Sequence, residues 1–156
     1  MNTNLTKALT LIGMTAFGYA YGQLNLNDYP AMKLIEPTGF VHSAKLLTGK
    51  NILILYFPDC DHCQREAAEI GKHIKAFTYY QVWFISIASH QDNARFAKDY
   101  QLAQHKNFHF VRTDAGDIYR NFGNLPTPSF FIYSAGRQLV KSFKGETTIE
   151  EILKAL

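Results

Sequence analysis

The residues of this sequence best suited to chemistry are its two cysteines, Cys60 and Cys63, which lie in the stretch LYFPDCDHCQREAAEI (residues 55–70). A spacing of three residues at the start of a helix puts both sulfurs on one face, close enough for a disulfide that opens and closes without moving the fold. The sulfur nearer the helix N-terminus lies beside unpaired N–H groups and the positive end of the helix dipole, which favour thiolate over thiol. We therefore expect Cys60 to be the nucleophile and Cys63, one turn deeper, to be the thiol that resolves a mixed disulfide.

Two other interpretations of the C-x-x-C motif remain open. Cys60, His62 and Cys63 are all potential metal ligands, but a structural zinc site usually has four ligands and the sequence contains no second C-x-x-C. An inert structural disulfide would stabilise the fold little, because the loop that it closes is so short. Strand, C-x-x-C and helix follow one another in the order typical of a redox dithiol, so we predict a reversible Cys60–Cys63 disulfide and no metal site.

The charged residues around the cysteines act in opposite directions. A protonated His62 would add positive charge beside the Cys60 thiolate and make the disulfide a better oxidant, although His62 is equally explained as a solvated residue of the first helical turn. Asp59 and Asp61 oppose this effect by like-charge repulsion. The direction of electron flow is therefore open at this stage.

Glu66 is a candidate proton acceptor. It follows Cys63 by three residues and lies on the same side of the predicted helix, where a carboxylate could take the Cys63 proton when that thiol must attack. The alternative is an exposed glutamate, since acidic residues are common in the first turns of helices.

The elements that must position these residues alternate between strand and helix. Strands are predicted for residues 51–57, 81–89 and 108–113, and helices for residues 60–77, for QDNARFAKDYQL and for 114–123. The stretch SFFIYSAGRQLVKSF predicts an antiparallel hairpin, and Thr147 and Glu150 have the spacing of a capping box that starts a last helix. The order implies an α/β fold, in which helices cover both faces of a mixed β-sheet.

A second functional signal is the stretch NFGNLPTPSFFIY, well beyond the cysteines in the chain. Pro126 precedes a strand and follows a glycine helix stop, which fits a cis X-Pro turn, with an ordinary trans proline as the alternative. Proline at the mouth of a strand leaves backbone groups of Leu125 free to pair with another chain. Pro128 is compatible with the strand only at its first position.

The N-terminal segment differs from the rest of the chain. Only Lys7 is charged in the first 22 residues, the run Ala8–Ala20 suits the apolar region of a signal peptide, and Ala20-Tyr21-Gly22 suits cleavage before Gln23. We predict a signal peptide at 1–22 and one domain at 23–156, with an uncleaved anchor or an apolar first helix as alternatives. Export would place the thiols in an oxidising space, which we expect to be the periplasm. The net charge of +3 is scattered without a basic block, so nucleic acid is not an expected partner.

Together these motifs resemble the thioredoxin superfamily, and within it the exported TlpA/ResA-like thiol-disulfide oxidoreductases and related redoxin domains, over residues 34–156. CDHCQRE is similar to the C-x-x-C-x-x-E motif of these proteins, and LPTP is similar to their cis-proline loop, with Pro126 as the proline. The segment SHQDNARFAKDYQLAQHKNFHF is similar to their extra helix and strand. The resemblance implies a thioredoxin-like mixed sheet flanked by helices, with an extra αβ insertion after the first βαβ.

The resemblance also implies a function. By this resemblance the nucleophile is Cys60, the resolving thiol is Cys63 and the nearby acid is Glu66. His62 takes the place of a histidine in oxidising relatives. The substrate-binding loop corresponds to Leu125 and Pro126. The expected partners are proteins with disulfides or dithiols and a redox partner protein, membrane-bound if it supplies electrons; we expect a monomer without a cofactor. A metal-binding or partner-binding module with little turnover is the alternative.

Three positions depart from the pattern of these families. Asp59 stands where a tryptophan is usual, and Ile54 where thioredoxin has a buried acid, so a proton relay would run through Glu66 or water. Phe57 stands where a typical peroxidatic cysteine has a threonine or serine three residues before it. These departures favour disulfide exchange over peroxidase activity.

Overall fold

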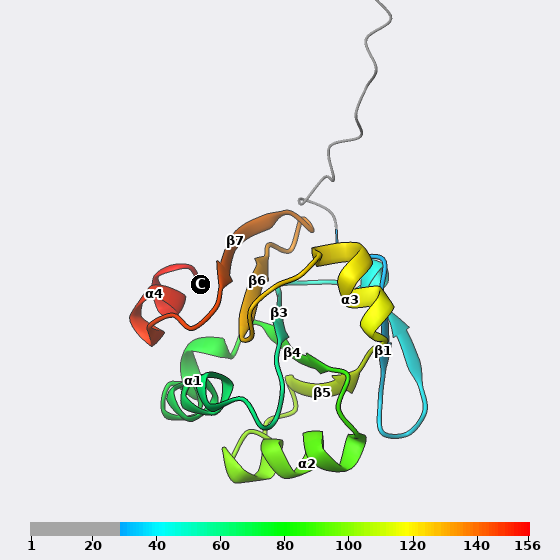
Figure 1. Ribbon diagram of the computed structural model, residues 1–156. Helices are drawn as coiled ribbons and strands as arrows, with labels where there is room; N and C mark the ends of the chain where they lie inside the picture. The colour runs from blue at the N-terminus through cyan, green and yellow to red at the C-terminus, as the bar shows by residue number, and fades with distance from the viewer. Residues whose placement is uncertain (1–28) are drawn as a thin grey trace, which may run out of the picture.

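A seven-stranded mixed β-sheet with helices on both faces forms the framework of the computed structural model, which describes residues 29–156 (Figure 1). The strands are β1 (Lys33–Ile35), β2 (Val41–Ser43), β3 (Asn51–Leu55), β4 (Gln81–Ser86), β5 (Phe108–Arg112), β6 (Ser129–Tyr133) and β7 (Leu139–Lys144). The α-helices are α1 (Asp61–Lys72), α2 (His90–Asp99), α3 (Ala115–Phe122) and α4 (Ile149–Lys154), and two 3₁₀ turns are η1 (Ala44–Leu46) and η2 (Ile74–Phe77).

The strand order is β2-β1-β5-β4-β3-β6-β7. Strands β3, β4 and β5 are parallel, whereas β6 pairs antiparallel with β3 and with β7. The unit β3-α1-β4 is the first βαβ, and α2 with β5 follows it as the expected extra pair. The predicted α/β fold, with a mixed sheet flanked by helices, is therefore confirmed.

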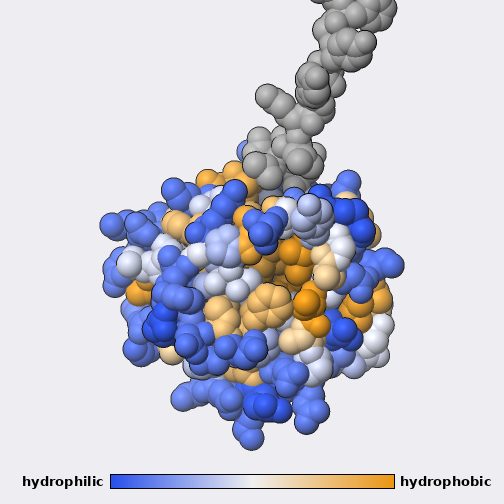
Figure 2. Space-filling view, viewed as in Figure 1, coloured by the Kyte–Doolittle hydropathy of each residue, from blue (hydrophilic) through white to orange (hydrophobic). Residues whose placement is uncertain are grey.

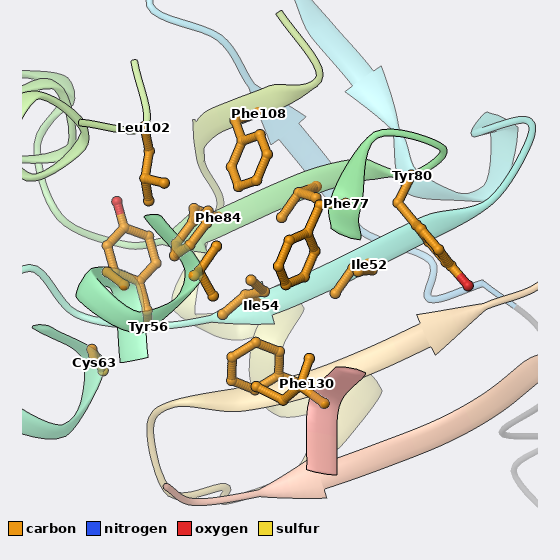
Figure 3. Close-up of a cluster of buried hydrophobic side chains, with 14 of the residues drawn as sticks. Ile52, Ile54, Tyr56, Cys63, Phe77, Tyr80, Phe84, Leu102, Phe108 and Phe130 are labelled. Carbon is orange, nitrogen blue, oxygen red and sulfur yellow. The ribbon is translucent and has the colours of Figure 1, made fainter. Parts of the chain in front are cut away.

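Strand β3 is buried along its whole length because the sheet is covered on both sides. Ile52 and Ile54 face one core, which α1, α2 and α4 cover, and Leu53 and Leu55 face a second core, which α3 covers. Figure 3 shows the first core, in which Phe84 and Phe130 flank Ile54 and Cys63 lies at the margin. One of the two cysteines is thus part of the hydrophobic core.

Some predicted boundaries were wrong. The helix expected to reach Phe77 ends at Lys72, where the His73 N–H is shared between the Glu69 and Ile70 carbonyls, and η2 then carries Phe77 into the core. The strand expected to reach residue 89 ends at Ser86, because the Ser89 side chain accepts from the Asp92 N–H and caps α2.

The cap of α4 was also wrong, by one residue. Thr148 is the N-cap and its hydroxyl accepts from the Glu151 N–H at 3.3 Å, so the capping pair is not Thr147 and Glu150. The Thr147 N–H instead donates to the Glu66 carboxylate, at 2.5 Å. Because the cap is Thr148, the backbone N–H of Thr147 is free to bind Glu66, the candidate catalytic acid.

The predicted signal peptide, residues 1–22, lies outside the described residues. Within 29–156, no helix has the length and apolar character needed to cross a membrane.

Replacing Thr148 with alanine is expected to lower the free energy of unfolding by about 1 kcal/mol, because the first turn of α4 loses its cap. Thr147→Ala is the matched control and should change it by less than about 0.5 kcal/mol, since the Thr147 side chain makes only an exposed contact with Glu151. Urea denaturation of both variants provides the comparison, and an equal loss in the two would contradict the assignment of the cap.

Candidate active site

The antiparallel register of β3 and β6 creates the candidate site. Leu55 at the end of β3 lies opposite Ser129 at the start of β6. The loop that leads from β3 to α1 and the proline loop that leads into β6 therefore meet at one end of the sheet. Cys60 and Thr127 come into contact there, although they are 67 residues apart in the chain.

Cys60 is the N-cap residue of α1. Its backbone is extended (φ −86°, ψ 115°), and its sulfur accepts from the Cys63 N–H at 3.3 Å. A negatively charged sulfur is stabilised at this position by the unpaired N–H groups of the first turn and by the helix dipole. The structure thus places Cys60 where the sequence predicted, with its side chain half-buried.

Cys63 differs from Cys60 in its surroundings. It is only 2% exposed, and its sulfur lies 2.7 Å from that of Cys60. Burial, followed by the contact with the Cys60 sulfur, raises the pKa of Cys63 to about 12. Cys63 is consequently a protected thiol that stays protonated until a base or a mixed disulfide at Cys60 activates it.

The cis peptide bond precedes Pro128, not Pro126. Pro128 is buried directly before β6, whereas Pro126 is exposed. The prediction for Pro126 was wrong because the sequence LPTP offers two prolines, and only the position of β6 shows which one abuts the strand. Leu125 packs against the second core rather than facing the cysteines.

Thr127 is a site residue that the sequence analysis missed. Its hydroxyl donates to the Cys60 sulfur at 3.8 Å, and the Cys60 thiol donates to its carbonyl at 3.6 Å. Thr127 also lines a pocket of about 320 Å³, together with Leu55, Tyr56, Phe57, Ile87, Ala115, Ile118, Tyr119, Gly123, Asn124 and Leu125. Figure 2 shows apolar surface on this face of the molecule, beside α3. An apolar pocket therefore opens next to the nucleophile.

Glu66 is buried, which excludes the exposed-glutamate alternative. It is 5% exposed, its Oε1 accepts from the Thr147 N–H, and its Oε2 has no hydrogen-bond partner among the described residues. Burial raises the pKa of Glu66 to about 7, against the opposing effect of the Thr147 N–H, and the nearby Glu146 adds to the rise. Glu66 can therefore gain or lose a proton near neutral pH, one helical turn from Cys63.

His62 is a solvent-exposed residue of the first helical turn, and its hydrogen-bond partners are Glu146 and Arg65 rather than Cys60. Its Nδ1 contacts the Glu146 carboxylate and lies 2.6 Å from Nη2 of Arg65. The Arg65 guanidinium, followed by His62, lowers the pKa of Glu146 to about 2. Arg65 and Glu146 are further residues that the sequence analysis missed; for Glu146 no signal was available, because it reaches the site only through the fold.

Metal ligation receives no geometric support. Among residues 29–156, no three histidine, cysteine or acidic side chains are grouped so that they could hold a metal ion.

Comparison with known proteins identifies the family. The model of the AhpC/TSA family matches residues 23–142. The chain belongs to the AhpC/TSA family. Among curated proteins, no sequence matches it significantly.

Solved structures with the same fold cover both disulfide oxidoreductases and peroxidoxins. A secreted Mycobacterium tuberculosis disulfide oxidoreductase homologous to E. coli DsbE is 18% identical, with a TM-score of 0.66 over 80% of this chain and 93% of that one. Peroxidoxin BcpB from M. tuberculosis is also 18% identical, with a TM-score of 0.66 over 83% and 94%. A thioredoxin-like protein from Aeropyrum pernix is 15% identical, with a TM-score of 0.62 over 81% and 89%.

The fold is thus thioredoxin-like, and this AhpC/TSA protein is a redoxin of the thioredoxin superfamily, as the motifs predicted. Family and dithiol together establish thiol-based redox chemistry as its general activity.

The raised pKa of Glu66 makes the stability of the protein depend on pH. Between pH 4.5 and about 7 the unfolded chain has released the Glu66 proton while the folded chain keeps it, so the free energy of unfolding falls as the pH rises. Over this pH range the free energy of unfolding falls by about 2 kcal/mol, after allowance for solvent screening. Glu66→Gln should remove this loss, so the variant should gain stability relative to the parent between pH 4.5 and 8.

Urea denaturation at several pH values, with the cysteines kept reduced, measures this difference. Glu150→Gln is the matched control, because Glu150 is exposed in the same α1–α4 region and should show no such trend. A constant difference between Glu66→Gln and the parent at every pH would contradict the raised pKa.

Proposed function

We propose that this protein is an exported thiol-disulfide oxidoreductase that exchanges its Cys60–Cys63 dithiol or disulfide with protein substrates. The observation that carries the proposal is the pair of sulfurs at the start of α1, one half-buried at the N-cap and the other buried 2.7 Å away. Such an arrangement joins a reactive sulfur to a protected one, which is what a reversible two-electron carrier needs.

In the reducing direction, the Cys60 thiolate attacks one sulfur of a substrate disulfide. A Cys60–substrate disulfide forms, the substrate S–S bond breaks, and the released substrate thiolate takes up a proton. The Cys63 thiolate then attacks the Cys60 sulfur, and the second substrate thiolate leaves. Two electrons have passed to the substrate and a Cys60–Cys63 disulfide remains; oxidation of a substrate dithiol is the same sequence reversed.

Glu66 is the proposed acceptor of the Cys63 proton. The pKa of Cys63, about 12, is far above neutral, so its attack requires removal of the proton at the moment of reaction. Glu66 has a pKa of about 7, lies one turn away and has a free Oε2, which supports this role directly or through one water.

The proline loop is the proposed substrate-binding element. The Thr127 N–H makes no hydrogen bond within residues 29–156, and its carbonyl contacts only the Cys60 thiol, so both are free for a substrate chain that adds as a strand. Leu125 and Pro126, the residues predicted from the sequence, flank this position, and Leu125 lines the apolar pocket. We propose no cofactor and a monomeric protein.

Peroxide reduction is the second candidate, because the AhpC/TSA match and the likeness to a peroxidoxin favour it. The local geometry favours disulfide exchange instead. Phe57 stands three residues before Cys60 and offers that cysteine only its backbone carbonyl. Among residues 29–156, the one hydroxyl that donates to the Cys60 sulfur belongs to Thr127.

The decisive experiment uses Cys63→Ser. Without the resolving thiol, the Cys60–substrate disulfide should persist, so non-reducing gels should show protein adducts that disappear with dithiothreitol. Cys60→Ser is the matched control and should trap nothing. Absence of adducts from native cellular extract, together with rapid turnover of hydrogen peroxide by the parent protein, would overturn the proposal in favour of a peroxidase.

Export is the second part of the proposal, and it rests on the leader-like residues 1–22; one structural relative is a secreted protein. Expression of the full chain in a bacterial host should yield a periplasmic protein that begins at Gln23. N-terminal sequencing of that protein is the measurement. A chain that keeps residues 1–22 and stays in the membrane fraction would instead indicate an uncleaved anchor.

A further inference from the structure

Three consecutive residues between β7 and α4, Gly145–Thr147, contact three separate parts of the dithiol site; we name them the connector. The Gly145 N–H donates to the Pro128 carbonyl at 2.9 Å, and the Thr147 N–H donates to Glu66. Between them, the Glu146 carboxylate reaches α1. Gly145 has φ +87°, a conformation in which residues other than glycine are strained.

Glu146 binds Arg65 through both carboxylate oxygens. Nε donates to Oε1 at 2.7 Å and Nη2 donates to Oε2 at 2.9 Å, the fork-to-fork geometry of a strong arginine–carboxylate pair. Oε2 also contacts Nδ1 of His62, within the C-x-x-C motif. One carboxylate on a distant loop therefore holds the two basic side chains of the first two turns of α1.

The His62 ring has a partner in either protonation state. Neutral Nδ1 can accept from Arg65, which lies 2.6 Å away, and protonated Nδ1 can donate to Glu146. The histidine is therefore kept on the side of α1 that faces the connector. Its charge, when present, is offset by the carboxylate that it touches.

This arrangement affects the dithiol through charge. Arg65 lies in the second turn of the helix that Cys60 caps, so the guanidinium and a Cys60 thiolate attract each other. Positive charge near that thiolate stabilises the reduced form and makes the disulfide more oxidising. The negative charge of Glu146 cancels part of this stabilisation of the thiolate. Asp61, whose charge also acts on Arg65, and Glu66, when it is ionised, oppose the thiolate in the same way.

We infer that Glu146 is a positioning residue that sets the redox equilibrium of the dithiol, by pairing with Arg65 and His62 so that their positive charge is not available to the Cys60 thiolate. The inference rests on the proposed thiol-disulfide exchange and adds to it a direction: the connector shifts the protein toward the reductant side.

The test is a redox titration against glutathione at pH 7 and low salt. Glu146→Gln keeps the shape of the side chain but removes its charge, and it should move the equilibrium about threefold toward the dithiol. A factor of about three is expected for one solvent-screened unit charge several ångströms from the half-buried Cys60 sulfur. Arg65→Gln should move it in the opposite direction, because Glu146 then remains without its cation. Sodium chloride at about 1 M should suppress both shifts.

These paired variants separate charge from structure. Both break the same ion pair, so mere loosening of the connector would shift the two equilibria in the same direction, and this result would overturn the inference. Glu150→Gln is the control: it removes a carboxylate from α4 that contacts neither Arg65 nor His62, and it should leave the equilibrium unchanged. Unchanged equilibria in Glu146→Gln and Arg65→Gln would equally overturn it.

The titration is independent of the trapping experiment. If the parent protein exchanges reversibly with glutathione but the Cys63→Ser variant traps no proteins, the proposed function is contradicted. The inference on Glu146 is then still decided by the shifts in redox equilibrium of Glu146→Gln and Arg65→Gln. Failure to form any reversible Cys60–Cys63 disulfide would overturn both.

Discussion

The register of β3 against β6 is the constraint on which the rest of the site depends. Because Leu55 pairs with Ser129, the chain that leaves β3 toward Cys60 and the chain that enters β6 through Pro128 must meet at the same end of the sheet. A slip of one residue would turn every side chain of β6 to the wrong core and move Thr127 away from the sulfur that it contacts. Five consecutive buried positions on each of these two strands hold the register in place.

At this end of the sheet, differences in environment give chemically similar groups different pKa values. Two thiols one helical turn apart differ because one caps the helix and the other enters the core, where desolvation raises the pKa of Cys63. Two glutamates also differ, Glu66 beside the connector and Glu146 within it: burial raises the pKa of Glu66, whereas the Arg65 guanidinium lowers that of Glu146. The site thus contains one carboxyl group with a pKa of about 7, Glu66, and one with a pKa of about 2, Glu146.

The sequence by itself determined the local features of this protein. The apolar run at 51–57, the amphipathic pattern after Cys60 and the short spacing of the cysteines each depend on neighbouring residues, and each predicted its element or its thiol pair correctly. The α/β class followed from the order of these elements. Predictions that required a choice between two similar residues failed, namely the α4 cap at Thr147 and the cis bond at Pro126. Thr147 is followed directly by a second threonine, and LPTP contains two prolines two residues apart.

Only the tertiary structure decided what surrounds the dithiol. Thr127 reaches Cys60 across 67 residues and Glu146 reaches His62 across 84, and no periodicity or spacing carries information over such distances. The fold also gives His62 a carboxylate partner, Glu146, which neither of the two interpretations left open by the sequence included. The sequence therefore identified the candidate dithiol, because the spacing of its cysteines is local. The electrostatic balance around the dithiol is a property of the fold, because charges interact through space rather than along the chain.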